Sequence, residues 1–311
     1  MSTALDQSDS PSGLTLAVGT YVFWGFLPLF MKQLAHIPPA EVIAHRIIWS
    51  LPIALAVLLA QRKGAHVWQA LRNPRLLAMA AICATLISVN WLIYVWSIAN
   101  DRAIEAALGY YINPLFSVFL GATLLGERLN RMQIVAIVLA AAAVLVLTVS
   151  AGRLPLVALG LTFSWGFYAY FKRRLPLGPN QGFTMEVLLL LPLALGYVIW
   201  LTGQGQAHFA TTGWHDTLFL LGCGPVTAIP LLMYANAAKQ VRLSTMGVLQ
   251  YIAPTMIFLT AVFVFGETFR GAQMIAFPMI WASLVIYSVV LVRQAGARRR
   301  MQRQSPTRRM Q

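Results

Sequence analysis

Ten long apolar runs, separated by short polar gaps, constrain this chain more than any other feature of its sequence. A helix needs about 20 apolar residues to cross a bilayer. Charged residues make up only 10% of the 311 residues, against about 25% in soluble domains. The sequence therefore predicts an all-α polytopic membrane protein with ten transmembrane helices. The runs lie at 14–34, 40–60, 76–98, 103–125, 132–150, 155–171, 182–201, 214–237, 243–265 and 272–292.

The charge of the chain is distributed as expected for a membrane protein. Its formal net charge is +14, but the basic residues cluster in the gaps between runs, which argues against nucleic-acid binding. With the N-terminus placed in the cytoplasm, 18 Lys and Arg fall in inside gaps and four fall outside. This asymmetry predicts cytoplasmic termini. We therefore expect an N-terminal tail over 1–13 and a basic cytoplasmic tail over 293–311, next to anionic membrane lipid.

An internal repeat appears when the chain is shifted by 140 residues. The shift predicts two five-helix halves, 14–150 and 155–292. Because five is odd, the second half would enter the membrane from the opposite side, forming an inverted repeat with a solute site between the halves near the midplane. The aligned residues Arg102, Tyr111, Ile112, Pro114, Gly126, Glu127, Gln133 and Ala136 recur as Arg242, Tyr251, Ile252, Pro254, Gly266, Glu267, Gln273 and Ala276.

Several stretches resemble a known family. Each half carries Pro-x₁₂-Glu near the end of its fourth helix, and the chain contains WGFLPLFMKQLAHIPPAEVIAHRIIWS and NWLIYVWSIANDRAIEAALGYYINPLFSVFLGATLLGERL. These features resemble the EamA family of the drug/metabolite transporter superfamily, and RarD-type permeases within it. The resemblance covers roughly residues 14–292. It implies a permease that carries out secondary transport in a bacterial inner (cell) membrane, without specifying the solute.

Polar and aromatic side chains inside the runs are candidates for a solute cavity, because polar groups in a membrane are costly and need a role. Asn113 and Pro114 lie about 15 Å into the fourth run, where Pro114 would loosen a helix and allow a hinge. The alternatives are a static kink, helix packing and interfacial anchoring. We expect the first, third, fourth, sixth, eighth and ninth spans to line the cavity. The predicted cavity residues are Trp24, Arg46, Asn90, Tyr94, Tyr110, Asn113, Pro114, Trp165, Tyr168, Tyr234, Gln250, Tyr251 and Pro254.

Arg46 is the charge inside a span that most needs an explanation. One interpretation is a cation that binds a substrate carboxylate or serves a gate. The other is snorkelling, or an ion pair with Glu105 or Glu41. If protons drive transport, an Arg46–Glu105 pair is the expected coupling element. Since the acids lie within about two turns of a membrane face, exchange or facilitated efflux is favoured. Glu186 occupies the repeat-equivalent position of Arg46, where Lys172 could neutralise it.

The remaining titratable groups indicate structural roles. Glu127 and Glu267 are expected to cap the helix that follows each of them, with a gate latch as the alternative. Cys83 and Cys223 are expected to be packing residues. The five histidines show no metal-ligand spacing, so we expect no metal site and no cofactor.

These features predict a secondary transporter of a small organic metabolite or drug-like solute, working by alternating access, with efflux as the expected direction. A passive channel or facilitator is the alternative. An intramembrane enzyme is disfavoured because the sequence contains no H-E-x-x-H and no G-x-S-x-G. The expected partners are the solute and membrane lipid. A homodimer through the fifth and tenth runs stays open.

Overall fold

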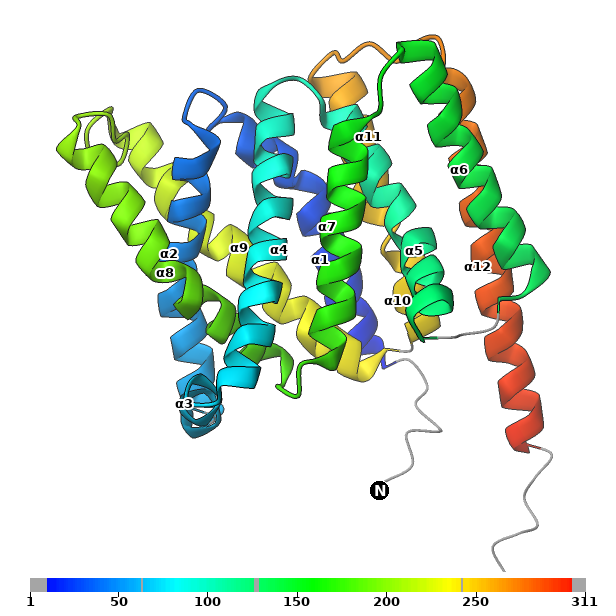
Figure 1. Ribbon diagram of the computed structural model, residues 1–311, viewed down its shortest axis with the longest axis horizontal. Coiled ribbons are helices and arrows are strands. Elements are labelled where there is room, and N and C mark those ends of the chain that lie inside the picture. The colour runs from blue at the N-terminus through cyan, green and yellow to red at the C-terminus, as the bar shows by residue number, and fades with distance from the viewer. Residues whose placement is uncertain (1–9, 63, 126–128, 242, 304–311) are drawn as a thin grey trace, which may run out of the picture.

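The computed structural model describes residues 10–62, 64–125, 129–241 and 243–303, and all regular elements in these ranges are helices (Figure 1). Within the described residues, nine helices are long and apolar enough to cross a membrane. The chain is therefore a multi-pass all-α membrane protein, which confirms the predicted fold class. In chain order the helices are α1 (Pro11–Lys32), α2 (Pro39–Ala60), α3 (Gly64–Leu71), α4 (Pro74–Ala99), α5 (Ala103–Leu125), α6 (Arg131–Ala151), α7 (Leu156–Arg174), α8 (Pro179–Gly203), α9 (Trp214–Gln240), α10 (Leu243–Leu249), α11 (Ile252–Leu259), the π-helix η1 (Thr260–Val264) and α12 (Gln273–Arg303).

One predicted span differs from the other nine. The run 155–171 forms α7, a helix of 19 residues whose last turn contains three basic residues, and α7 is not among the nine apolar helices. It packs against both α4 and α5. Its polar side chains bond to those neighbours: Thr162 donates to the Gly109 carbonyl over 3.1 Å, and Ser164 accepts from Asn90 over 2.9 Å. Helix α7 is thus less apolar than the other nine because its 19 residues include three basic ones, while its Thr162 and Ser164 side chains bond to neighbouring helices.

Prolines and short polar residues mark where the long helices begin. Proline lies in the first turn of α1, α2, α4 and α8, where its missing N–H leaves no hydrogen bond unmade. Ser10 and Asn73 accept hydrogen bonds from the first-turn N–H groups of α1 and α4, and Asn130 forms a capping box with Gln133 at α6. Helices of 22 residues are about 33 Å long, which matches the hydrocarbon core of a bilayer.

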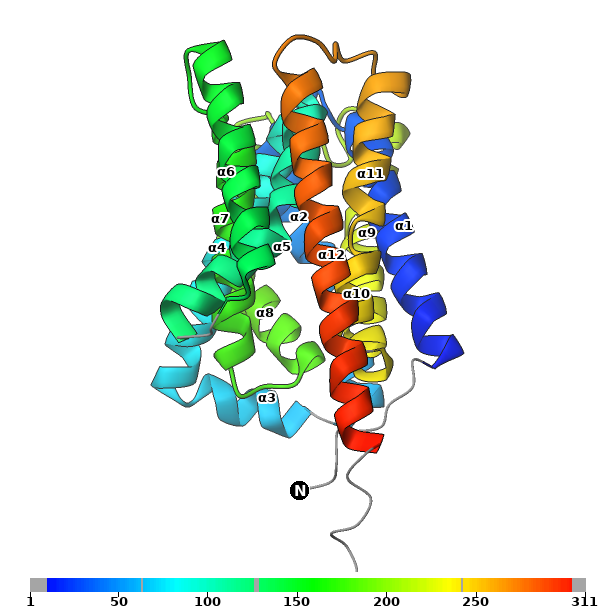
Figure 2. The same cartoon turned by 90° about the vertical axis from the view of Figure 1, so that its right-hand side faces the viewer.

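The start of α1 and the end of α12 lie at the same end of the bundle, which we call the terminal end (Figures 1 and 2). Helix α3 and the connection between α7 and α8 also lie there. The connections that follow α4, α6 and η1 lie at the opposite end. A chain that begins α1 and ends α12 at the same end of the bundle crosses the bundle an even number of times. The predicted basic tail is helical as far as Arg303.

The ninth predicted span, 243–265, is not one continuous helix. It consists of α10, a turn at Gln250 and Tyr251, α11 and η1. Pro254 has no N–H to donate to the Gln250 carbonyl, and the break falls at that carbonyl. By contrast, α5 runs unbroken through Pro114.

The two predicted halves do not fold as separate bodies. Helix α1 packs against α9 and α11, α2 packs against α8 and α9, and α5 packs against α7 and α11. Helices α6 and α12 pack on each other at one side of the bundle (Figure 1). Their outer faces carry exposed aliphatic residues such as Val138 and Val285, as expected for surfaces in contact with lipid. The interleaving brings residues from both halves to the centre.

Candidate functional site

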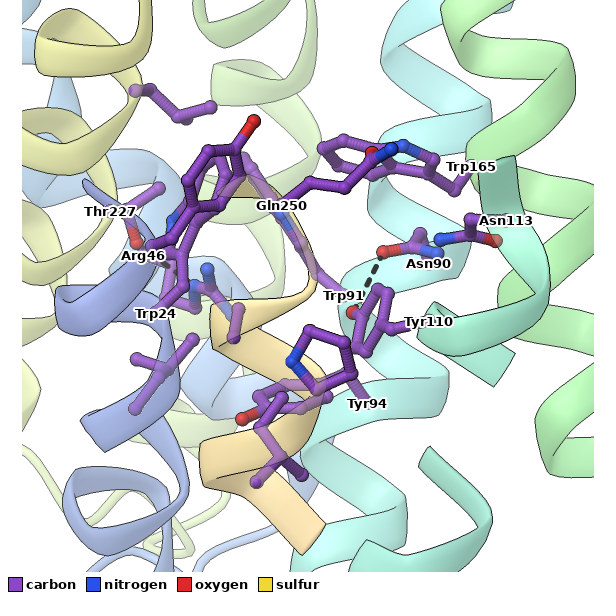
Figure 3. Close-up of a pocket in the computed structure, with 16 residues that line it drawn as sticks. Trp24, Arg46, Asn90, Trp91, Tyr94, Tyr110, Asn113, Trp165, Thr227 and Gln250 are labelled. Atoms are coloured by element: carbon purple, nitrogen blue, oxygen red, sulfur yellow. Dashed lines mark hydrogen bonds between the residues drawn. The ribbon is translucent and has the colours of Figure 1, made fainter. Parts of the chain in front are cut away.

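A central cavity of about 100 Å³ lies between helices of both predicted halves (Figure 3). Residues of α1, α2, α4, α5, α7, α9 and α11 line it, together with Gln250 from the turn that precedes α11. The cavity is mainly aromatic and aliphatic, with a few polar groups, which is typical of sites for organic ligands. The lining residues are Tyr21, Trp24, Leu27, Arg46, Asn90, Trp91, Tyr94, Tyr110, Asn113, Trp165, Thr227, Leu231, Gln250, Ala253, Pro254 and Ile257.

Nine of the thirteen predicted cavity residues line this cavity: Trp24, Arg46, Asn90, Tyr94, Tyr110, Asn113, Trp165, Gln250 and Pro254. The other four lie elsewhere. Pro114 is buried within the bundle on α5. Tyr168 bonds to Glu186, and Tyr234 packs on the rings of Tyr21 and Trp24. Tyr251 lines a second groove, between α5, α11 and α12. These four residues lie on α5, α7, α9 and the turn before α11, which contribute to the cavity, but they are not among its lining residues.

Trp91 is one of seven lining residues that the predicted set does not contain. The predicted polar face of α4 contains Asn90 and Tyr94, and Trp91 falls one residue outside that face. Its ring nevertheless lies 4.7 Å from the guanidinium carbon of Arg46. This contact depends on how α2 meets α4, which the pattern within either run does not show. The lining also includes α2, a span that was not among those expected to form the cavity.

Arg46 is buried, with 4% of its surface exposed, and its described partners are neutral. Its Nε donates to Thr227 Oγ1 over 2.9 Å, and its guanidinium lies over the Trp91 ring. Nη1 has no hydrogen-bond partner among the described residues. The predicted pair with Glu105 is absent, because the Glu105 carboxylate lies 3.9 Å from Arg102. The predicted alternative, Glu41, is also engaged elsewhere.

Glu41 lies fully buried at the start of α2 and binds the 204–213 connection. Its two oxygens accept from the backbone N–H of His208 over 2.7 Å and from His208 Nδ1 over 2.8 Å. Nearby, Asp216 lies 3.1 Å from both His36 and His215. Three histidines that are dispersed in the sequence therefore gather around two carboxylates at the opposite end. Among the described residues, no such group has a geometry that could hold a metal ion.

Asn90 organises the polar side of the cavity. Its Nδ2 donates to the Leu161 carbonyl over 3.1 Å and to Ser164 Oγ over 2.9 Å. Its Oδ1 accepts from the Tyr110 hydroxyl over 3.3 Å. Two neighbouring groups, the Tyr94 hydroxyl and Asn113 Oδ1, are buried without a partner among the described residues. The cavity thus contains both fixed and free polar groups.

Aromatic rings form a further part of the cavity wall. Trp24 meets Trp165 edge to face with ring centroids 6.3 Å apart, and Tyr21 meets Trp24 at 5.8 Å. Edge-to-face packing holds such rings in defined orientations. This wall joins α1 of the first predicted half to α7 of the second, so an aromatic or amphipathic solute would contact both halves.

Glu267 connects the two predicted halves at the opposite end, but not as the sequence predicted. Its carboxylate accepts from the backbone N–H groups of Ala103 over 2.6 Å and Ile104 over 2.9 Å. It therefore caps α5 and not the helix that follows it. Burial raises the pKa of the Glu267 carboxyl above its ordinary value, although these two hydrogen bonds oppose the shift. Glu127, its predicted counterpart, lies outside the described residues.

Both cysteines, Cys83 on α4 and Cys223 on α9, are free and buried, with no exposed surface. They lie on helices that line the cavity, but neither side chain is among the lining residues.

The fold defines a multi-pass membrane protein with a central, mainly aromatic and aliphatic cavity, and the comparison with protein families identifies its class as membrane transporters. The EamA-like transporter family matches the chain twice, over residues 11–149 and 154–289. This chain belongs to the EamA-like transporter family, as its resemblance had indicated.

Known relatives extend over nearly the whole chain. Protein RarD of Streptomyces exfoliatus is 42% identical over 302 residues, which cover 97% of this chain and 96% of the relative. An uncharacterized transporter of Vibrio cholerae is 38% identical, covering 95% and 98%. A solved structure described as "Crystal structure of protein" has a TM-score of 0.60 at 22% identity, covering 91% of this chain and 99% of that one. That structure supports the fold alone.

Proposed function

We propose that this protein is a secondary transporter that moves a small organic metabolite or drug-like solute across the cell membrane by alternating access. The observation that carries the proposal is the central cavity, to which helices of both predicted halves contribute. Alternating access requires a site that both parts of a transporter share, so that a change in their relation exposes the site to one side at a time. The small cavity would have to widen to admit a drug-sized solute.

Exchange or facilitated efflux fits the cavity better than proton coupling. A proton-driven carrier generally places a titratable carboxylate or histidine in its pathway. No carboxylate or histidine of the described residues is among the lining residues. An imposed pH gradient should therefore drive little flux at a fixed solute gradient. A large pH-driven flux would contradict this part of the proposal.

We propose an inner-membrane location with both termini in the cytoplasm. The excess of basic residues in the predicted inside gaps and the shared end of α1 and α12 (Figure 2) support this orientation. Reporter fusions in the 61–75 gap should show a cytoplasmic location, and fusions in the 204–213 connection should show the outside location. The reverse pattern would overturn the orientation.

Saturable counterflow is the direct test of transport. The purified protein should be reconstituted in liposomes loaded with unlabelled solute, and uptake of labelled solute followed. A relative from Pseudomonas aeruginosa, 30% identical, is named chloramphenicol-sensitive protein RarD, so chloramphenicol belongs in the first solute panel. A carrier gives transient accumulation that saturates. Linear, non-saturating flux would indicate a channel or facilitator instead.

Thiol labelling tests whether the cavity is the pathway. In a background with Cys83 and Cys223 replaced by alanine, we expect Asn113→Cys and Gln250→Cys to react with a polar thiol reagent. Val138→Cys and Val285→Cys are matched controls on lipid-facing surfaces, with 60% and 63% of those valines exposed. Equal labelling of all four positions would remove the cavity from the pathway.

A further inference from the structure

The acidic residues described by the structure leave Arg46 without a counter-ion. Glu41 binds His208, and Glu186 binds Lys172. The remaining four are also engaged: Asp101 with Lys32, Glu105 with Arg102, Asp216 with His36 and His215, and Glu267 with the start of α5. None lies within ion-pair distance of Arg46. Arg46, with 4% of its surface exposed, therefore has no carboxylate among the described residues to neutralise its positive charge.

An uncompensated buried charge is costly. Removing one partner of a buried ion pair is strongly destabilising, because the charge that remains has neither water nor a counter-ion around it. Thr227 and Trp91 reduce this cost for Arg46 with one hydrogen bond and one cation–π contact, but neither carries a negative charge. A charged side chain is costly to bury. If it faces a cavity, a bound ligand of opposite charge can offset that cost.

The free polar groups of the cavity define the rest of the ligand. Nη1 of Arg46 is a free donor, and the Tyr94 hydroxyl and Asn113 Oδ1 have no described partner. In Figure 3, Arg46 and Thr227 lie on one side of the cavity, and Asn90, Asn113 and Trp165 lie on the other. A carboxylate suits Arg46, since a guanidinium binds it through two parallel hydrogen bonds. A hydrogen-bond donor on the ligand suits Asn113, and an aromatic body suits the tryptophans of the lining, Trp24, Trp91 and Trp165.

We propose that Arg46 binds the anionic group of the transported solute, and that the solute is an organic carboxylate with an aromatic or amphipathic body. This inference rests on the proposed function and names the substrate class of the same cavity. It also explains why no acidic residue of the described ranges lines the cavity, because a carboxylate there would neutralise Arg46 and repel the solute.

Matched pairs of acids and amides test the proposal. Binding to the purified wild type should be measured by tryptophan fluorescence and by thermal shift, with indole-3-acetate against indole-3-acetamide, and phenylacetate against phenylacetamide. We expect the carboxylates to bind at least tenfold more tightly than the amides. Arg46→Gln should abolish that preference, and Arg46→Lys should keep part of it. Arg131→Gln, which removes an exposed arginine at the start of α6, should keep all of it.

Stability without ligand gives a second readout that needs no solute. If the charge of Arg46 is neutralised only when a solute anion binds, Arg46→Gln should leave the melting temperature of the ligand-free protein unchanged or raise it. A drop of several degrees would show a structural role and overturn the proposal. So would equal binding of acids and amides by the wild type, or a thermal shift with chloride or phosphate alone as large as that with the carboxylates.

Counterflow separates this inference from the proposed function. A wild type that exchanges the amides as fast as the acids is still a carrier, and only the assignment of the anion falls. A wild type that shows no saturable counterflow with any acid, any amide or chloramphenicol loses the proposed function as well.

Discussion

Arg46 on α2 and Glu186 on α8 occupy positions 140 residues apart, which the predicted repeat makes equivalent, yet the protein treats the two charges differently. Both are buried, with 4% and 2% of their surfaces exposed. Glu186 lies 2.5 Å from Lys172 Nζ and accepts from the Tyr168 hydroxyl over 3.3 Å. Arg46 contacts only neutral groups among its described partners. One charge is neutralised within the protein, and the other stays available beside the cavity.

The presence or absence of a charged partner separates the structural pair at Glu186 from the proposed ligand site at Arg46 more sharply than burial does. By burial alone the two residues look alike. Only the partner distinguishes them, because a buried pair neutralises itself whereas a buried single charge needs an external ion. We expect the two sites to respond in opposite ways to neutralisation.

The largest loss of folding stability should come from breaking the Lys172–Glu186 ion pair. Lys172→Met leaves the Glu186 carboxylate buried without its cation, and removal of one partner from a buried pair costs about 3–5 kcal/mol. The Lys172 side chain is 23% exposed, so we expect the lower part of that range. The measurement is the free energy of unfolding in mixed detergent. Lys172→Met combined with Glu186→Leu should recover most of the loss, and Arg46→Gln should show no comparable loss.

If Lys172→Met costs no more than a surface substitution, the pair contributes little and the contrast between α2 and α8 disappears. If the double variant is as unstable as the single one, packing of the lysine chain, and not its charge, explains the effect.

A smaller effect should come from the helix contact that supports Arg46. A Cβ atom added at Gly224 on α9 would lie 2.2 Å from the Trp49 carbonyl oxygen on α2. Gly224→Ala should therefore push the two helices apart, at a cost of about 1–3 kcal/mol, and should weaken carboxylate binding through the Arg46–Thr227 contact. Melting temperature and affinity measure the two effects.

Gly196→Ala on α8 is the matched control, because no atom lies within 4 Å of the added Cβ. It should leave stability and binding unchanged. A similar loss in both variants would mean that the cavity side of the bundle is no more tightly packed than its surface.

The smallest loss of folding stability is expected at Glu267. Its carboxylate is stabilised by the backbone N–H groups of Ala103 and Ile104, whereas Glu186 is stabilised by a lysine. Glu267→Ala should cost about 1 kcal/mol, as the loss of a helix cap does. Because burial raises the pKa of Glu267 from 4.5, the folded protein binds this proton more tightly than the unfolded chain. The stability that the group contributes is therefore greatest below about pH 4.5 and falls as the pH rises through its raised pKa.

Comparing the wild type with Glu267→Gln isolates the pH dependence that the Glu267 carboxyl contributes, because glutamine has a similar size and does not titrate. Melting temperatures measured from pH 4.5 to 8 should show the wild type losing stability relative to the glutamine variant as the pH rises. Parallel curves would mean that this carboxyl has the same pKa in the folded and unfolded states.

The sequence was sufficient for the features that depend on one helix at a time. Run lengths gave the membrane spans, and the depth of Trp24, Asn90 and Asn113 along their runs indicated that they could reach a shared cavity. The break in the ninth span was not predicted, although it lies at the carbonyl that Pro254 leaves without a donor. These features follow from local chain chemistry.

The features that the sequence did not provide depend on contacts between distant segments. Glu267 was expected to cap the nearest helix, but α5, 164 residues away in sequence, presents its first N–H groups to it. Trp91 reaches Arg46 only because α2 crosses α4. The Arg46–Glu105 pair was inferred from a shared depth, and the structure shows that shared depth does not imply adjacency.

The broken ninth span gives the bundle unequal mechanical properties on its two sides. The helix is interrupted at the turn of Gln250 and Tyr251, and Pro254 leaves the Gln250 carbonyl without a helical donor, so rotation there breaks fewer hydrogen bonds than rotation within a regular helix. The corresponding rotation in α5 would have to bend a continuous helix of 23 residues. We therefore expect α11, which contributes Ala253, Pro254 and Ile257 to the lining, to tilt at this turn while α5 stays straight, so that the cavity widens on its α11 side.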